Sequence, residues 1–253
     1  MSYEIKNFDD NDDVELGEDH GPFRIVEYIR DLSCTPNEAE LKYYMSMQNV
    51  RRRQLLCELD GNGITLSPGA MQWMVGDIKQ TTGIKGVGDA LGKMVGGKVT
   101  GEAAFKPEYK GYGVLVTEPT YKHLLIYDLS EWKRGMVVQD GLFYACENNI
   151  QLQVERIKSA SGVMLGGEGL FNLKLKGNGY CVLESLVPVE ELITVDLDDD
   201  TIKIDGSYAI AWSPDLRFTV EKSGKTLLGS AVSGEGLVNV YSGTGRVIMM
   251  PQV

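Results

Sequence analysis

The sequence reads GGEGLFNLKLKGNGYCVLES at residues 166–185 and SGEGLVNVYSGTGRVIMM at residues 233–250. Both stretches contain a Gly-Glu pair, an apolar run, a Gly-x-Gly turn and a second apolar run. A weaker copy, TGEAAFKPEYKGYGVLV, lies at residues 100–116. Self-similarity at a nearly constant interval is typical of a repeated structural unit. We therefore predict three copies of one module.

Two further landmarks recur in the same order and set the limits of the repeats. A leucine after an acidic residue comes first and a turn glycine follows it, at Leu59 and Gly69, Leu129 and Gly141, and Leu197 and Gly206. The predicted domains are an N-terminal extension at 1–47, repeat 1 at 48–118, repeat 2 at 119–187 and repeat 3 at 188–253. We expect the repeats to pack as one compact body in a pseudo-threefold arrangement.

The repeats have the residue pattern of β-strands. Phe171-Asn172-Leu173-Lys174-Leu175-Lys176 alternates strictly between apolar and polar residues, and residues 201–205 do the same. Period-two alternation places one face of a strand on a core and the other in water. Short strands separated by Gly, Asn and Asp turns are typical of sandwiches and barrels. The sequence predicts an all-β protein of three tandem β-sandwich-like repeats.

Two segments depart from this pattern. Thr35, Pro36 and Glu38 have the order of a helix start, which predicts a helix over residues 36–46. A Gly-rich insert at 83–98, GIKGVGDALGKMVGGK, is surplus to the first repeat. Its glycines stand four residues apart, an arrangement that permits close backbone approach. The insert is consistent with a weak helix on the sheet, a loop or an oligomer contact.

Composition and charge exclude several classes of protein. The 253 residues include 36 Asp and Glu against 25 Lys and Arg, giving a net charge of -11. Nucleic-acid binding and anionic-membrane binding through bulk charge both need a cationic face, so neither is expected. The N-terminus has no pattern of a secretory signal or transit peptide, and no apolar run has the length of a transmembrane segment. We expect a cytoplasmic protein.

The glycine-acid landmarks resemble a known family. GGEGLFN, SGEGLVNV, SPGAMQWM at 67–74 and DGSYAIAWSPDLRFTVE at 205–221 are similar to the altered inheritance of mitochondria protein twenty-four family, over residues 48–253. The resemblance implies a fold like that of the tryptophan RNA-binding attenuation protein (TRAP), within the double-stranded β-helix group. It implies mitochondrial inheritance for eukaryotic members, a role that we do not extend to a chain without a transit peptide. It implies no activity.

Motifs for catalysis or metal binding are not found in the sequence. A two-His iron site would need both His20 and His123, which lie in no ligand motif. Gly92–Lys98 has the spacing of a phosphate loop, but Val99 stands where Ser or Thr must bind Mg²⁺. The four cysteines form no C-x-x-C pair and are read as small buried apolar residues. We expect no cofactor, no metal and no enzymatic activity.

Two clusters of charged residues are candidate binding residues. Glu102, Glu168 and Glu235 occupy equivalent places in the three repeats, each after a glycine. They either converge on a cation or on basic side chains, or each accepts hydrogen bonds from its own turn. Arg51-Arg52-Arg53 is the basic cluster of the sequence and is read as a solvated strand start, with an anion or RNA contact as the alternative.

These observations favour a non-enzymatic cytoplasmic β-scaffold that acts through protein–protein or self-association surfaces. Sheets with exposed edges pair readily with further chains, so a homo-oligomer or a protein partner, which the sequence does not identify, is expected. The alternative is a small-molecule-binding protein, by analogy with the tryptophan-binding TRAP fold.

Overall fold

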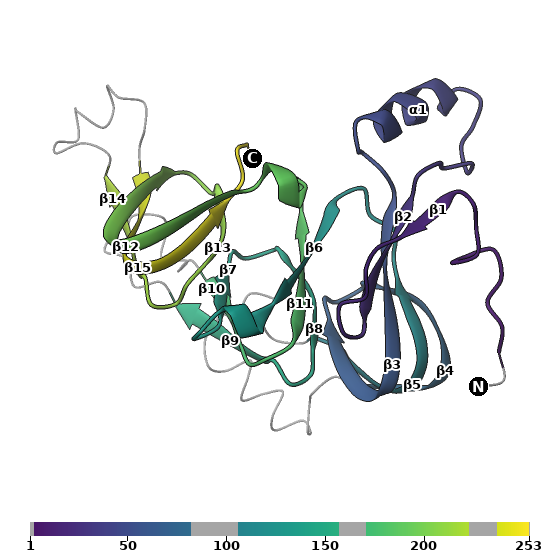
Figure 1. Ribbon diagram of the computed structural model, residues 1–253, viewed down its shortest axis with the longest axis horizontal. Coiled ribbons are helices and arrows are strands. Elements are labelled where there is room, and N and C mark those ends of the chain that lie inside the picture. The colour runs from purple at the N-terminus through teal and green to yellow at the C-terminus, as the bar shows by residue number, and fades with distance from the viewer. Residues whose placement is uncertain (1–2, 82–105, 157–170, 223–236, 253) are drawn as a thin grey trace. The chain divides into compact units, whose positions relative to one another are not determined.

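A computed structural model describes residues 3–81, 106–156, 171–222 and 237–252 (Figure 1). The chain divides into two compact units. Unit 1 contains Met1–Tyr127, Tyr144–Asn149 and Gly179–Pro188, and unit 2 contains Asp128–Phe143, Ile150–Asn178 and Val189–Val253. Across the described residues each unit is built on one β-sheet, so the prediction of an all-β protein is confirmed.

The sheet of unit 1 has eight strands in the described part of the chain. They are β1 (Val14–Leu16), β2 (Phe23–Tyr28), β3 (Arg53–Leu66), β4 (Met71–Thr81), β5 (Glu108–Thr117), β6 (His123–Asp128), β8 (Phe143–Glu147) and β11 (Tyr180–Ser185). Their order is β1-β2-β3-β8-β11-β6, and β5 pairs with both β3 and β4. β3 therefore lies between β5 on one side and β2 and β8 on the other.

Apolar side chains cover both faces of this sheet. Leu55 and Cys57 belong to one buried cluster and Leu56 to the other, because successive residues of a strand point to opposite faces. The N-terminal segment closes the second face, where Phe8 meets Trp73 edge-on with ring centroids 5.4 Å apart. This second cluster is called the covered face of unit 1.

The predicted N-terminal helix is present as α1 (Ala39–Met47), which begins three residues later than expected. The hydroxyl and the backbone N–H of Thr35 both donate to the Glu38 carboxylate, at 2.8 and 3.1 Å, and form a turn ahead of the helix. Asn49 has a φ of 61° just past the C-terminal end, and the N–H of Val50 donates to the carbonyl of Met45 at 2.9 Å. This Schellman arrangement ends the helix. α1 lies beyond the ends of β2 and β3 and not across the sheet (Figure 1).

Unit 2 has seven strands in its described residues. They are β7 (Met136–Val138), β9 (Gln151–Arg156), β10 (Phe171–Lys176), β12 (Ile193–Asp205), β13 (Ala209–Trp212), β14 (Arg217–Lys222) and β15 (Leu237–Met249), with short 3₁₀ turns at η1 (Leu129–Glu131) and η2 (Val189–Glu191). β15 lies between β12 on one side and β13 and β14 on the other. Trp212 packs on Phe218 and Tyr241 in the core, with ring centroids 5.7 and 5.2 Å apart.

The outer repeats build the same local strand pairing. Leu59 of β3 pairs with Gly113 of β5, and Leu197 of β12 pairs with Gly245 of β15. The register shifts just beyond each pair, and both leucines are buried in the core of their own unit. The first and third landmarks therefore mark equivalent points of two separate sheets.

Residues 119–187, the predicted second repeat, are divided between the two units. β6, β8 and β11 join the sheet of unit 1, while β7 and β10, with β9, join that of unit 2. Alternation identifies a strand but not the neighbours that it hydrogen-bonds, so the sequence could not assign these short strands to sheets. Leu129 is buried as expected but lies in η1 and not in a strand. The packing of the repeats as one body and their pseudo-threefold arrangement stay predictions, and the insert at 83–98 lies outside the described residues.

Candidate functional site

The predicted carboxylates at Glu102, Glu168 and Glu235 lie outside the described residues. Their convergence on one site stays a prediction. Among the residues that are described, no group of three or more His, Cys, Asp or Glu side chains has an arrangement that could hold a metal ion.

The described histidines and cysteines belong to the framework of unit 1. His20 lies edge-on to Tyr180 with ring centroids 5.6 Å apart, and His123 begins β6. Cys57 and Cys146 are fully buried, and burial raises the pKa of both thiols above the usual range. Neither is a thiolate at neutral pH, which is the form a nucleophile or metal ligand requires.

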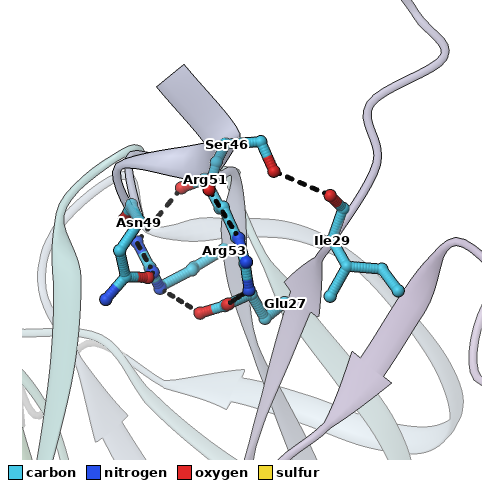
Figure 2. Close-up of polar contacts among 6 residues, drawn as sticks. All are labelled: Glu27, Ile29, Ser46, Asn49, Arg51 and Arg53. Carbon is cyan, nitrogen blue, oxygen red and sulfur yellow. Dashed lines mark hydrogen bonds and ion pairs between the residues drawn. The ribbon is translucent and has the colours of Figure 1, made fainter. Parts of the chain in front are cut away.

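The basic cluster at 51–53 attaches α1 to the sheet and is not a solvated strand start. Arg53 is buried at the first position of β3, and its Nε lies 2.6 Å from the Glu27 carboxylate. Arg51 reaches the other oxygen of Glu27 at 2.7 Å, so one carboxylate of β2 binds two arginines. Arg53 also donates to the backbone and side-chain oxygens of Asn49, at 3.1 and 2.6 Å (Figure 2). The residue that follows the C-cap of α1 is thereby fixed to β3.

Arg52 contacts Tyr28 and Asp31 and not Glu27, and it completes the attachment of this segment to unit 1. Its guanidinium carbon lies 3.8 Å from the centre of the Tyr28 ring, a cation–π contact, and its Nη2 lies 3.6 Å from Asp31. All three arginines therefore have partners within unit 1. This arrangement does not favour the anion or RNA contact that was the alternative reading of the triplet.

Polar side chains of α1 face the body of unit 1. Lys42 donates to the Asp31 carboxylate at 3.2 Å and to the carbonyl of Ser33 at 2.9 Å. Ser46, one turn further along, donates to the carbonyl of Ile29 at 2.8 Å (Figure 2). Residues three and four apart lie on the same side of a helix, so this inward side carries two polar side chains, with the half-buried Met45 beside them. No residue of α1 is buried.

Apolar side chains occupy the opposite side of the helix. Leu41, Tyr43, Tyr44 and Met47 are 60% to 66% exposed and are called the apolar face of α1. The rings of Tyr43 and Tyr44 contact each other edge-on, at a centroid distance of 5.4 Å. A helix of a soluble protein normally turns its apolar stripe to the core and its polar residues to water. In α1 this order is reversed for these four side chains, and of its larger apolar residues only Met45 lies on the inward side.

Sequence reasoning missed the apolar face. The spacing of Leu41, Tyr44 and Met47 is visible in the sequence, but an apolar stripe alone predicts packing against the sheet. The signal that could have revealed the reversal is the pair Lys42 and Ser46 on the other side, together with the ionisable Asp31 shortly before the helix. The orientation follows only once these polar partners are placed.

Unit 2 contains an open hollow of about 660 Å³ where β13 gives way to β14. Arg246 makes a bidentate pair with Asp196, at 2.7 and 3.0 Å, and Arg134 lies 2.9 Å from Asp215. The hydrogen bond from Arg246 holds the pKa of Asp196 below its usual range. The hollow therefore offers paired charges, on partly exposed side chains, to a polar compound.

The described residues contain no helix with the length and apolar character needed to cross a membrane. α1 has only nine residues.

Comparison with known proteins finds a matching family and similar bacterial proteins. The family model described as mitochondrial biogenesis AIM24 matches residues 45–252. An uncharacterized protein of Streptococcus pyogenes serotype M6 is 28% identical over 235 residues, which cover 89% of this chain and 90% of that protein. A crystal structure of a Streptococcus pyogenes protein, determined by a structural genomics consortium, is similar with a TM-score of 0.59 and 25% identity, over 80% of this chain and 88% of that chain.

Proposed function

This chain belongs to the mitochondrial biogenesis AIM24 family, as its glycine-acid landmarks predicted, and we propose that it is a non-enzymatic cytoplasmic scaffold that binds polypeptides through the apolar face of α1. The proposal rests on one observation: the helix turns Lys42 and Ser46 inward, while the four side chains of its apolar face are 60% to 66% exposed. Contiguous exposed apolar residues on a soluble protein mark interaction sites.

The low stability expected of α1 on its own supports a partner that covers its apolar face. A nine-residue helix is shorter than the ~12–15 residues below which isolated helices are marginal in water. α1 buries no side chain, so its attachment depends on hydrogen bonds and ion pairs that each contribute only about 1 kcal/mol. A partner that covers the apolar face adds a hydrophobic term to a helix in which, of the larger apolar side chains, only Met45 is half-buried.

A finer assignment of the fold belongs to the same proposal. We propose that residues 48–253 descend from three TRAP-like repeats of the double-stranded β-helix type with a pseudo-threefold arrangement. The equivalent pairing of Leu59 with Gly113 and of Leu197 with Gly245 supports a common ancestor for the outer repeats. Repeats of this kind carry surfaces and loops whose function is not set by the fold itself.

Photo-crosslinking tests the proposed function. A benzophenone amino acid replaces Tyr44 on the apolar face, and a control protein carries it at Tyr112 of β5, which is equally exposed at 61%. On irradiation in cells, we expect discrete protein adducts from position 44 and none from position 112. Equal labelling at both positions, or no protein adduct at position 44, would overturn the proposal.

A small-molecule-binding role is the second candidate, and the hollow in unit 2 favours it. Its volume of about 660 Å³ lies within the range of ligand pockets. A polar ligand would be oriented by the Arg246–Asp196 pair. Thermal-shift screening of charged metabolites tests this role, with Arg246→Met as the variant that should abolish any shift. A screen without a hit that depends on Arg246 would contradict it.

A further inference from the structure

We infer that the occupant of the apolar face of α1 is a second copy of this chain, packed about a twofold axis helix against helix. This inference rests on the proposed function and names its partner. It depends on the composition of the face, on its area and on the charges beside it.

The apolar face is self-complementary in its polar groups. Glu40 lies among the apolar residues, since it is three residues before Tyr43, four before Tyr44 and seven before Met47. Within the described residues, the Glu40 carboxylate and the Tyr43 and Tyr44 hydroxyls make no hydrogen bond or ion pair. Carboxylates only accept hydrogen bonds and hydroxyls can donate them. A twofold contact supplies both groups from both copies, so each Glu40 can accept from a tyrosine of its partner.

The area of the face fits a pair of copies. A large side chain presents roughly 150–250 Å² in all, so four of them at about 60% exposure offer on the order of 500 Å². Two copies that cover this face completely bury about 1,000 Å² in total, which is the lower limit for a specific interface. If the partner had no apolar face of its own, the contact would bury only half of that apolar area.

The arrangement of backbone dipoles also favours this pairing. Two helices related by a twofold axis across their long sides run antiparallel, which places the positive N-terminal end of each beside the negative C-terminal end of the other. The C-terminal end of α1 already has a cationic neighbour, since Arg51 Nε donates to the carbonyl of Ser46 at 3.2 Å, and an antiparallel partner adds the positive end of a second helix to it.

Charge argues against a lipid surface as the occupant. Helices that lie in a membrane interface have Lys and Arg on their polar face, whereas α1 has the single Lys42, which is paired with Asp31. Glu40 is exposed among the residues of the apolar face, Glu38 is exposed at the start of the helix, and the chain carries a net charge of -11. Anionic headgroups would repel it. Two copies repel each other as well, but salt screens that repulsion over about 8–10 Å, so the pairing should strengthen as salt is added.

Sedimentation equilibrium of the full chain tests the inference, over about a hundred-fold range of concentration. The test variant is Leu41→Glu, and the matched control is Leu186→Glu, because the two leucines are 62% and 61% exposed. A glutamate at position 41 lies in the first turn of α1, where the helix dipole favours it, so the helix itself is not weakened. Circular dichroism and the thermal transition of each variant verify folding.

We expect the natural chain and Leu186→Glu to form dimers of equal affinity, and Leu41→Glu to raise the dissociation constant at least about tenfold. A dimer that persists in Leu41→Glu, or that Leu186→Glu weakens equally, would place the interface elsewhere and overturn the inference.

The crosslinking experiment separates failure of this inference from failure of the proposed function. A monomeric chain whose position 44 captures a different protein overturns the second copy and leaves the scaffold intact. A monomeric chain with no protein adduct overturns both. Flotation with vesicles of phosphatidylcholine and phosphatidylglycerol tests the lipid alternative. If the chain binds the vesicles and Leu41→Glu abolishes this binding, the occupant of the apolar face is a lipid surface and the inference of a second copy is overturned.

Discussion

Two parts of the N-terminal extension treat apolar side chains in opposite ways. The segment before β2 uses Phe8, Val14 and Leu16 to close the covered face of unit 1, with the Phe8 ring against Trp73. The segment after β2 forms α1, which turns its apolar face to solvent. The first segment completes a hydrophobic core, whereas the second adds nothing to one.

This comparison separates the apolar side chains that stabilise unit 1 from those that are exposed on its surface. Removal of apolar atoms from a core costs transfer energy and leaves a cavity, but removal from an exposed site costs little. If α1 served only to stabilise unit 1, its apolar residues would point inward, as those of the earlier segment do. Its orientation is therefore better explained by an external contact than by the stability of the unit.

The largest expected effect comes from matched leucine truncations. Leu56→Ala in the covered face should lower the free energy of unfolding by about 2–5 kcal/mol, because Leu56 is only 4% exposed. Leu41→Ala on the apolar face should change it by less than about 0.5 kcal/mol when the chain is monomeric. Urea denaturation at low protein concentration measures both. Similar losses from the two substitutions would mean that α1 is packed in the monomer after all.

A smaller effect is expected from the carboxylate that fixes the helix to the sheet. Glu27→Gln removes the charge that binds the buried guanidinium of Arg53, and we expect a loss of about 2 kcal/mol, the size of a hydrogen bond to a charged group. Glu18→Gln is the control, since the side chain of Glu18 is exposed, lies outside α1 and has no partner among the described residues. Chemical denaturation of both variants gives the comparison. An unfolding energy that Glu27→Gln leaves unchanged would show that the arginines find other anions.

The hydrogen bond from Ser46 to Ile29 should have a local effect. Ser46→Ala removes the donor, and a net loss of about 1 kcal/mol is expected in the attachment of α1. Hydrogen exchange of residues 39–47 should become faster while exchange in β3 stays the same. Ser33→Ala provides the control, because Ser33 binds Lys42 through its backbone carbonyl, which the substitution retains. Faster exchange in both variants would contradict a specific role for Ser46.

The sequence predicted the positions of the strands and of the helix better than it predicted which residues each of them contacts. Local chemistry at Thr35, Pro36 and Glu38 is enough to place the start of α1 within three residues, because helix-start signals act over a single turn. The orientation of α1 depends on Asp31, Ile29 and Glu27, which the helix reaches only in the folded chain. Likewise, alternation identified β10 as a strand, but its pairing with β7 is a long-range contact without a local signal.

The smallest expected effect is the pH dependence of the Asp31 contact. Burial raises the pKa of Asp31, but hydrogen bonds from Lys42 and from the N–H of Ser33, with the charge of Arg52, outweigh burial and leave it below the usual value. A carboxyl group with a depressed folded pKa stabilises the protein above its unfolded pKa of about 3.9, and this contribution is lost as the pH falls through the folded pKa.

Asp31→Asn should therefore lower the unfolding energy by less than about 1 kcal/mol at neutral pH, as expected for a partly exposed ion pair. The difference from the natural chain should shrink below about pH 4, because Asp31 is then increasingly protonated in both states. Urea titrations of the two proteins between neutral and acidic pH measure this difference. If it stays constant over the whole range, the ionised form of Asp31 does not hold α1, and the inward polar side of the helix must be retained by Ser46 and the arginines alone.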